Sequence, residues 1–559
     1  MPPAREFGAR AANSRSVSSA WRAAVIGALV AALATLPGLG VGTLWDNSET
    51  AYGEVAREIL IYHDPIVLHF NGVPWFVQPP LYFWIAAAFA HLFGLNEFTL
   101  RLPSALATIA MGGAVGYVVA RTTSSSAALL AATVLSTSLM QVVVGRLAIM
   151  DALLDLAVAI AILSAFAALR TGAAQWWYVC CGALAFGMLA KGPAALVVTA
   201  IVIVPWAIWE RRSGGRVVLP SAARWILGAA LFAAIVGPWA ILLYRAAGSA
   251  AFAELVGHYT VGRYIGTIEN QGGPLYYYVP VIILGTFPWF PFLVPGVLAS
   301  IRAARDPAAG APARLCLSWA VIPFVFFSLA QTKLPNYIAL QLPAFAIMIA
   351  IWFDEIVRRD DRRAALAWTA VVPFTIGGLA FAISAFSHDN KLTRDLSVLH
   401  DAATGATWAI LIGSALCFIL LLRKSTAIFG PFVLGATSVA TLLILAIVAE
   451  PLVEPFKPIP PLAAVIQRER QPSDLVAIEG VSGENALIFY TVPPVEALDL
   501  SGSGKQAEHD PRRGICAARR VFVVTSRTRS VPTYGRTRSM LAVADKDALY
   551  LYEGPRCKN

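Results

Sequence analysis

The chain has 559 residues, of which 58% are hydrophobic and only 14% are charged. A soluble globular protein is usually about a quarter charged, so this composition excludes an ordinary soluble fold and indicates many membrane spans. The net charge of +10 does not indicate nucleic-acid binding, because the basic residues form short clusters between apolar segments. Such a distribution is typical of the cytoplasmic loops of membrane proteins.

The first apolar segment, residues 23–42, is long enough to cross a bilayer core of roughly 30 Å. Four arginines precede it. Its length and the spans that follow favour a signal anchor over a cleaved signal peptide, with residues 1–22 in the cytoplasm. We predict about thirteen spans, at residues 23–42, 101–120, 126–144, 152–169, 176–190, 193–209, 223–244, 276–299, 315–330, 337–353, 365–386, 405–422 and 427–449.

Residues 79–95 form a further apolar segment that is short for a span, opens with two prolines and is rich in aromatic residues. If this segment crossed the membrane, the arginine clusters at 211–216 and 358–363 would both lie outside. The positive-inside rule therefore favours an interfacial helix. With that topology, the transmembrane domain is 23–449 and its first outer loop, 43–100, faces the extracytoplasmic side.

The character of the chain changes after a proline-rich linker, residues 450–461. In residues 462–559, short β-branched and aromatic runs alternate with turn residues, which predicts strands. The predicted strands are DLVAIEGVS from residue 474, ALIFYTV from 486, RRVFVVTS from 519 and ALYLYEG from 548, with a helix over 461–470. The fold predicted is an all-α polytopic membrane protein with a small C-terminal α/β extracytoplasmic domain.

Acidic residues crowd the segment that directly follows the first span. Asp46 and Glu49 are three residues apart, and Glu54 and Glu58 are four apart, so each pair shares a face if the segment is helical. For Glu54 and Glu58 we favour a solvated helix with ordinary ion pairs. For Asp46 and Glu49, which are nearest the membrane surface, we favour a functional role.

Two acids stand at the beginning of the span 152–169. Asp151 lies where Asp is a common N-cap, and capping is compatible with catalysis. Asp155 follows one turn later inside an otherwise apolar helix, where an acid is costly. We expect Asp155 to have a structural partner such as an arginine.

Cationic residues lie in two other outer segments. Arg263 follows His258 by five residues, and Lys333 and Tyr337 lie at helical spacing just ahead of a span. Snorkelling to lipid headgroups is the alternative for an isolated lysine. Because several cations share a side of the membrane with a cluster of acids, we favour charge-assisted binding of phosphate.

The order of several motifs between about residues 40 and 350 resembles that of a known family. The motifs are SETAYGEVAREIL, NGVPWFVQPPLYFW, NEFTLRLPSAL, LAKGP, HYTVGRY and TKLPNYI. They resemble the polyprenyl-phosphate-dependent glycosyltransferases of the GT-C fold, most of all the bacterial lipid A aminoarabinose transferases and, more distantly, the protein O-mannosyltransferases. The resemblance implies transfer of a sugar from a polyprenyl-phosphate carrier to a lipid A-like lipid, a glycan or a protein, at the outer face of the bacterial inner membrane.

The same resemblance implies catalytic acids. The acid pair in the family's first loop falls on Ser48 and Glu49, so either Glu49 or the displaced Asp46 must carry its role. The second essential acid falls on Asp151. We expect Glu49 and Asp151 to be indispensable, with Asp46 secondary.

The carrier-phosphate contacts of the family fall on Arg263, Lys333 and Tyr337, and a metal-binding histidine falls on His258. The family's Glu-Lys pair before the two prolines is replaced here by Val77 and Gln78. One metal ligand and one lysine are thereby lost, and Gln78 offers the substrate only a neutral hydrogen bond. We expect the protein to work without a transition metal, although a divalent ion at His258 is the alternative.

The implied reaction inverts the anomeric carbon through a transition state of oxocarbenium character. Arg263 and Lys333 would stabilise the leaving phosphate, Glu49 or Asp46 would act as base toward a hydroxyl acceptor, and Asp151 would orient the acceptor or the sugar. A transporter or flippase of an amphipathic lipid-linked substrate is the alternative function. It leaves unexplained why the ionisable groups gather at one surface rather than near the midplane.

Overall fold

The computed structural model divides the chain into two compact units, and each unit combines separate stretches of sequence. Residues described are 4–45, 48–262, 264, 266, 272–307, 309–359, 400–423, 425–481, 483–491, 495–498, 518–528, 533 and 535–554. The helical unit comprises Met1–Leu39, Phe76–Tyr82 and Arg101–Val448. The mixed unit comprises Gly40–Trp75, Phe83–Leu100 and Ala449–Asn559.

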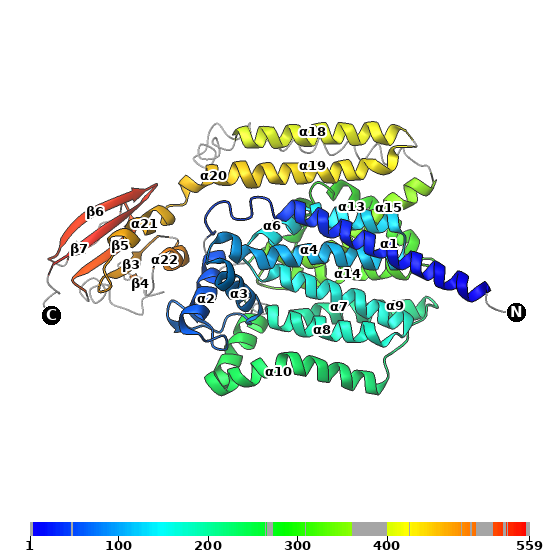
Figure 1. Ribbon diagram of the computed structural model, residues 1–559, viewed down its shortest axis with the longest axis horizontal. Helices are drawn as coiled ribbons and strands as arrows, with labels where there is room; N and C mark the ends of the chain where they lie inside the picture. Colours follow the sequence, from blue (N-terminus) through cyan, green and yellow to red (C-terminus); the bar gives the residue numbers. More distant parts are fainter. Residues whose placement is uncertain are drawn as a thin grey trace. The chain divides into compact units, whose positions relative to one another are not determined.

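Apolar helices build the helical unit, and most of the long ones run in similar directions (Figure 1). They are α1 (Ala4–Thr35), α4 (Glu97–Thr122), α5 (Ser125–Thr137), α6 (Leu139–Arg146), α7 (Asp151–Thr171), α8 (Ala174–Lys191), α9 (Ala194–Arg212), α10 (Ala222–Phe252), α12 (Tyr278–Gly285), α13 (Phe290–Ala304), α14 (Ala311–Leu329), α15 (Leu342–Arg359), α18 (His400–Leu422) and α19 (Gly430–Ile444). Shorter segments are η1 (Ala253–Gly262), η2 (Pro335–Gln341), η4 (Ala427–Phe429) and η5 (Leu445–Ala449).

Within the described residues, nine helices are long and apolar enough to cross a membrane. The number rises to eleven if α5 with α6, bent by 59°, and α12 with α13, bent by 104°, each form one span. The predicted fold class of a polytopic, mostly helical membrane protein is confirmed. The total of about thirteen stays a prediction, because the expected span 365–386 lies outside the described residues and α8 is not among the nine.

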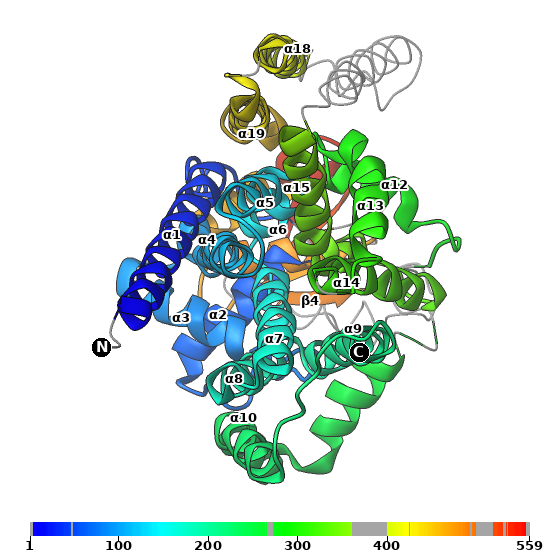
Figure 2. The ribbon, with the colours of Figure 1, turned by 90° about the vertical axis from the view of Figure 1, so that its right-hand side faces the viewer.

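The centre of the helical unit is formed by α7 and by η2 with α15. In each of these two spans, 83% of the most apolar 18-residue stretch is buried. The corresponding share is 22% for α10, which lies at the edge in Figure 2. Small residues allow close packing around α7: a Cβ added at Gly187 of α8 would lie 2.4 Å from the Cβ of Ala195 and 3.2 Å from that of Ala157. The tight contact fixes the ends of α7, α8 and α9 relative to one another.

The mixed unit combines the first outer loop with a small C-terminal sheet. Its elements are α2 (Glu49–Tyr62), β1 (His69–Phe70), β2 (Val73–Pro74), most of α3 (Leu81–Phe93), α20 (Glu450–Val453), η6 (Glu454–Phe456), α21 (Ile459–Glu469), β3 (Leu475–Glu479), α22 (Glu484–Tyr490), β4 (Val495–Leu498), β5 (Arg520–Ser526), β6 (Thr537–Ala544) and β7 (Asp547–Glu553). The sheet order is β4-β3-β5-β7-β6. β3 runs parallel to β4 and β5, whereas β7 is antiparallel to β5 and β6.

Alternation of side chains gives this sheet two buried faces. Val476, Ile478 and Phe522 belong to a large core that also contains residues of α21 and α22. Ala477 and Val523, at the intervening positions, belong to a second, smaller cluster. The predicted small α/β domain is confirmed as a mixed sheet with helices, and the predicted domain boundaries stay a prediction.

One predicted strand is wrong. The run ALIFYTV falls largely in the helix α22, whose residues Ala486, Leu487, Ile488 and Phe489 are all buried. A short apolar run has the same composition in a buried strand and a buried helix, so periodicity does not separate the two. The short helix α3, which is apolar but below span length, corresponds to the interfacial helix expected over 79–95.

The expectation that Glu54 and Glu58 lie on a solvated helix is also wrong. Their exposed fractions are 0% and 1%. Arg57 forms an ion pair with Glu54, and its guanidinium donates to the carbonyl oxygens of Ile488 at 3.2 Å and Phe489 at 2.8 Å. Burial raises the pKa of Glu54 to about 8. These side chains therefore tie α2 to the C-terminal end of α22 inside the mixed unit.

Candidate functional site

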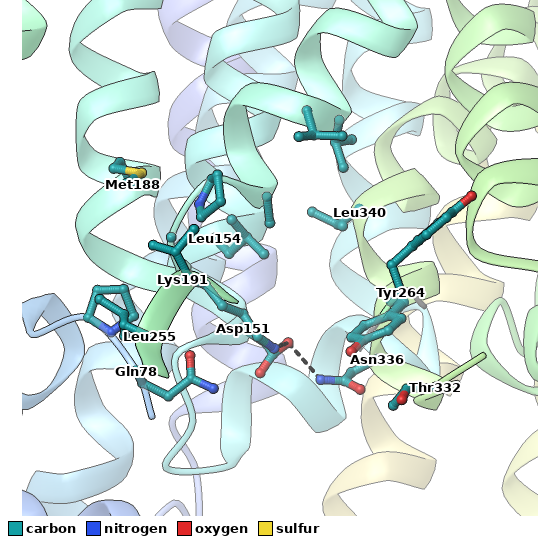
Figure 3. Close-up of a pocket in the computed structure, with 18 of the residues that line it drawn as sticks. Gln78, Asp151, Leu154, Met188, Lys191, Leu255, Tyr264, Thr332, Asn336 and Leu340 are labelled. Carbon is teal, nitrogen blue, oxygen red and sulfur yellow. Dashed lines mark hydrogen bonds and ion pairs between the residues drawn. The ribbon is translucent and has the colours of Figure 1, made fainter. Parts of the chain in front are cut away.

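A cavity of about 400 Å³ lies within the helical unit, where α7, α8, η1 and η2 meet the segment 77–79 (Figure 3). Apolar side chains form most of its wall, among them Trp239, Phe252 and Phe326. Its polar and charged lining residues are Gln78, Asp151, Asp155, Lys191, Tyr264, Thr332, Asn336 and Tyr337. The combination suits a ligand with an apolar part and a small polar group.

Asp151, the first residue of α7, is the most strongly bound polar side chain of the cavity. Its Oδ1 accepts hydrogen bonds from Lys191 Nζ and from Asn336 Nδ2, both at 2.6 Å (Figure 3). Met150 occupies the N-cap position, so Asp151 does not act as the expected N-cap. The two hydrogen bonds join the start of α7 to the end of α8 and to η2.

The 3₁₀ segment η2 places two neighbouring residues in the cavity wall. Asn336 donates to Asp151, as above, and the ring of Tyr337 lies 5.7 Å from Lys191 Nζ. Phe327 packs against the same ring, with centroids 5.1 Å apart. Pro335 starts the segment, and its fixed φ suits the first position of a helical turn.

Gln78, Asp151 and Tyr337 are the residues predicted from sequence that the structure brings together around the cavity. Lys333 is buried beside it, and its Nζ donates to the carbonyl oxygen of Ala330 at 2.5 Å. Asn336 was not expected as a site residue. The only signal for it was its place in the TKLPNY motif, directly before Tyr337.

The other predicted site residues are not part of this constellation. Glu49 begins α2 in the mixed unit, is 1% exposed, and accepts the backbone N–H of Trp45 at 2.9 Å. Asp46 and Arg263 lie outside the described residues, as does the side chain of His258. Their roles stay predictions.

Asp155 is the second acid of the cavity. It is 2% exposed, and its Oδ2 has no hydrogen-bond partner in the described part of the chain. No arginine among the residues of known placement pairs with it, and Arg263 lies outside them, so the expected arginine partner stays a prediction. A carboxylate of this kind lining a cavity is available to a ligand.

Metal binding finds little support in the described residues. They contain no group of three or more His, Cys, Asp or Glu side chains placed to hold a metal ion. Val77, which lines the cavity where the family has a carboxylate, supplies no ligand atom. Because the side chain of His258 is not described, the independence from a transition metal stays a prediction.

Comparison with known proteins finds similarity over a segment that contains part of the cavity lining. Residues 77–242 match the model of the dolichyl-phosphate-mannose-protein mannosyltransferases. The undecaprenyl phosphate-alpha-4-amino-4-deoxy-L-arabinose arabinosyl transferase of Erwinia tasmaniensis is 33% identical over 331 residues, or 58% of each chain. The protein of the same name from Pectobacterium carotovorum is 30% identical over 376 residues, covering 65% of this chain and 66% of the relative.

These alignments span roughly three fifths of the curated relatives, 58% of the Erwinia protein's length. The crystal structure of ArnT from Cupriavidus metallidurans bound to undecaprenyl phosphate covers 96% of this chain and 99% of its own, with a TM-score of 0.81 and 19% identity. At that identity the likeness establishes the fold. The resemblance predicted from the sequence is confirmed: the chain has the GT-C fold and is similar to the undecaprenyl-phosphate aminoarabinose transferases.

Proposed function

We propose that this protein transfers a sugar from a polyprenyl-phosphate carrier to an acceptor at the outer face of the bacterial inner membrane. The observation that carries the proposal is Asp151, held by Lys191 and Asn336 at an otherwise apolar cavity. A polar group bound deep among apolar side chains is what a lipid-linked sugar requires. Both Asp151 and Lys191 lie within the segment that matches the mannosyltransferase model.

The names of the similar proteins refine the donor. The Erwinia relative is named for undecaprenyl phosphate 4-amino-4-deoxy-L-arabinose, and the ArnT structure of the same fold is described as bound to undecaprenyl phosphate. We therefore assign the donor as an undecaprenyl-phosphate-linked aminopentose. The acceptor is a hydroxyl or phosphate group of a lipid A-like lipid, with a glycan or protein as the alternatives.

In the reaction, the bond between the anomeric carbon and the phosphate oxygen breaks, and its electrons go to the phosphate. Arg263, Lys333 and Tyr337 stabilise the negative charge that develops on the phosphate. Lys333 is close enough to the cavity for this role, because Ala330, the residue whose carbonyl oxygen it contacts, lines the wall. Fixed cations that face a leaving phosphate stabilise the transition state more than the ground state.

The acceptor oxygen forms the new bond on the opposite face of the sugar, which inverts the anomeric carbon. With a hydroxyl acceptor, its proton passes to Glu49 or Asp46 as general base. Asp151 positions the sugar or the acceptor through Oδ2, since Oδ1 already accepts two hydrogen bonds among the described residues. A phosphate acceptor needs no base, and the three acids then only position the substrates.

A transfer assay with purified protein in lipid nanodiscs and a labelled undecaprenyl-phosphate sugar tests the proposal. Glycosylated acceptor should accumulate with the wild type. Glu49→Gln should lower turnover by roughly 10²–10⁴-fold if Glu49 is the base. The matched control is Glu355→Gln, since Glu355 pairs with Arg302 away from the cavity.

Two results would count against these assignments. Donor movement across the membrane without any glycosylated product would favour a flippase over a transferase. Normal turnover of Glu49→Gln together with an inactive, folded Asp46→Asn would transfer the role of base to Asp46.

A further inference from the structure

Asp155 lines the cavity yet has no part in the mechanism above. It lies four residues after Asp151 on α7, so both carboxylates share one helix face, separated by a rise of about 6 Å. Its exposed fraction is 2%, and Oδ2 lacks a hydrogen-bond partner among the described residues. An unpartnered acid at this depth is costly unless a bound group satisfies it.

The lining of the cavity offers more acids than bases in the described part of the chain. Its acidic and basic side chains are those of Asp151, Asp155 and Lys191. Lys191 Nζ lies 2.6 Å from Asp151 Oδ1 and forms an ion pair with it. Asp155 faces the space that a ligand enters, so a cationic group bound there would form an ion pair with its carboxylate.

The geometry points to a specificity role: we propose that Asp155 binds the ammonium group of the donor sugar and so selects amino sugars over neutral ones. This inference rests on the proposed function. A single carboxylate suffices for an ammonium group, whereas a metal ion would need a cluster of ligands that the described residues do not provide here. The anionic phosphate of the same donor would be repelled from Asp155, which orients the sugar with its amine toward α7 and its phosphate away.

The arrangement divides recognition between two acids on one helix. Asp151, which pairs with Lys191 and accepts a hydrogen bond from Asn336, is suited to hydroxyl groups, which any sugar offers. Asp155 is suited to a cation, which only an amino sugar offers. Loss of a charge-assisted hydrogen bond typically lowers binding by about tenfold to hundredfold.

The test compares two undecaprenyl-phosphate donors that differ only in the amine, free in one and N-acylated, hence neutral, in the other. Wild-type protein should show a higher kcat/KM for the free amine. Asp155→Asn should lower kcat/KM for the amine donor by about tenfold to hundredfold and leave that for the acylated donor within about twofold, because only the charged contact is lost. Asp354→Asn, the same change on α15 outside this cavity, should keep the wild-type ratio.

The wild-type ratio of kcat/KM for the two donors can overturn the role of Asp155 even if Asp155→Asn fails to fold. A wild-type protein that uses both donors equally well would overturn the role of Asp155 and leave the transferase proposal standing. A folded Asp155→Asn variant with the wild-type ratio would do the same, and would indicate a partner for Asp155 within the protein. If wild-type protein neither transfers sugar from any polyprenyl-phosphate donor nor binds undecaprenyl phosphate, the proposed function itself fails.

Discussion

The two ends of α7 bury acids in different ways. At its first turn, Asp151 is paired but its neighbour Asp155 lines a cavity without a hydrogen-bond partner for Oδ2 among the described residues. At its last turn, Arg170 joins Glu210 and Arg314 in a cluster in which Glu210 and Arg314 are both 0% exposed. The acids at the two ends are similarly buried, but they differ in how many of their carboxylate oxygens have hydrogen-bond partners.

In the cluster of Arg170, Glu210 and Arg314, both oxygens of the carboxylate have partners. Glu210 Oε1 accepts from Arg170 at 2.5 Å, and Oε2 accepts from Arg314 Nε at 2.8 Å. Arg314 Nη1 also donates to the carbonyl oxygens of Ala304 at 2.6 Å and Asp306 at 3.0 Å. The cluster holds α7, α9 and α14 together, and both carboxylate oxygens of Glu210 have a guanidinium partner. In the helical unit, the acid with an unpartnered oxygen lines a cavity, whereas the acid with both oxygens paired joins helices, so burial alone does not mark a functional site.

Arg314→Ala should have the largest effect on stability. It leaves the carboxylate of Glu210 paired only with Arg170 and removes the donors to three carbonyl oxygens. Breaking a buried pair by removing one partner costs about 3–5 kcal/mol. Chemical denaturation in mixed micelles measures this loss, and a variant within about 1 kcal/mol of wild type would show that the cluster does not hold the helices.

Asp151→Asn should show the reverse pattern, a loss of activity with little loss of stability. The amide keeps the shape of the side chain but loses the charged acceptor, so kcat/KM for the donor should fall by about tenfold to hundredfold. The unfolding free energy should change less than for Arg314→Ala, because the cavity lets water or ligand solvate Lys191. Equal losses of stability in Asp151→Asn and Arg314→Ala would contradict the difference proposed between the two ends of α7.

The contrast also shows what the sequence alone reveals. Spans such as 152–169 follow from apolar length, and Asp151 and Tyr337 follow from motif order. Asn336 does not, because its role arises from a 2.6 Å contact across 185 residues of chain. The burial of Glu54 was missed for a similar reason, since its partner Arg57 binds carbonyl oxygens of α22, more than 400 residues further along the chain.

Glu54 in the mixed unit gives a pH-dependent test of how the burial of an acid affects stability. Its pKa in the folded protein, about 8, lies above the ordinary value of 4.5 because burial disfavours the charge. Between these values the unfolded chain has released the proton while the folded chain retains it, so the free energy of unfolding falls as pH rises from about 4.5 to about 8. The effect is confined to this window and is partly offset by Arg57.

Glu54→Gln stays neutral at every pH, so it should remove this slope and gain stability over wild type as pH approaches 8. Thermal unfolding at several pH values between about 5 and 8 checks the expectation. Glu469→Gln, the same change at the end of α21, where the side chain is 37% exposed, is the control. Parallel pH profiles for wild type and Glu54→Gln would mean that Glu54 is already ionised in the folded protein.

Arg302→Ala should have the smallest effect. Its guanidinium Nη2 lies 2.9 Å from Glu355 Oε2, a distance similar to that in the Arg314 pair, but the Arg302 side chain is 51% exposed. Water and salt screen an exposed pair, which typically contributes about 0.2–1 kcal/mol. The same denaturation measurement used for Arg314→Ala provides the comparison, repeated at high salt, where the small contribution of Arg302 should shrink further. If Arg302→Ala proved as costly as Arg314→Ala, pair geometry rather than burial and saturation would govern the stability of the helical unit.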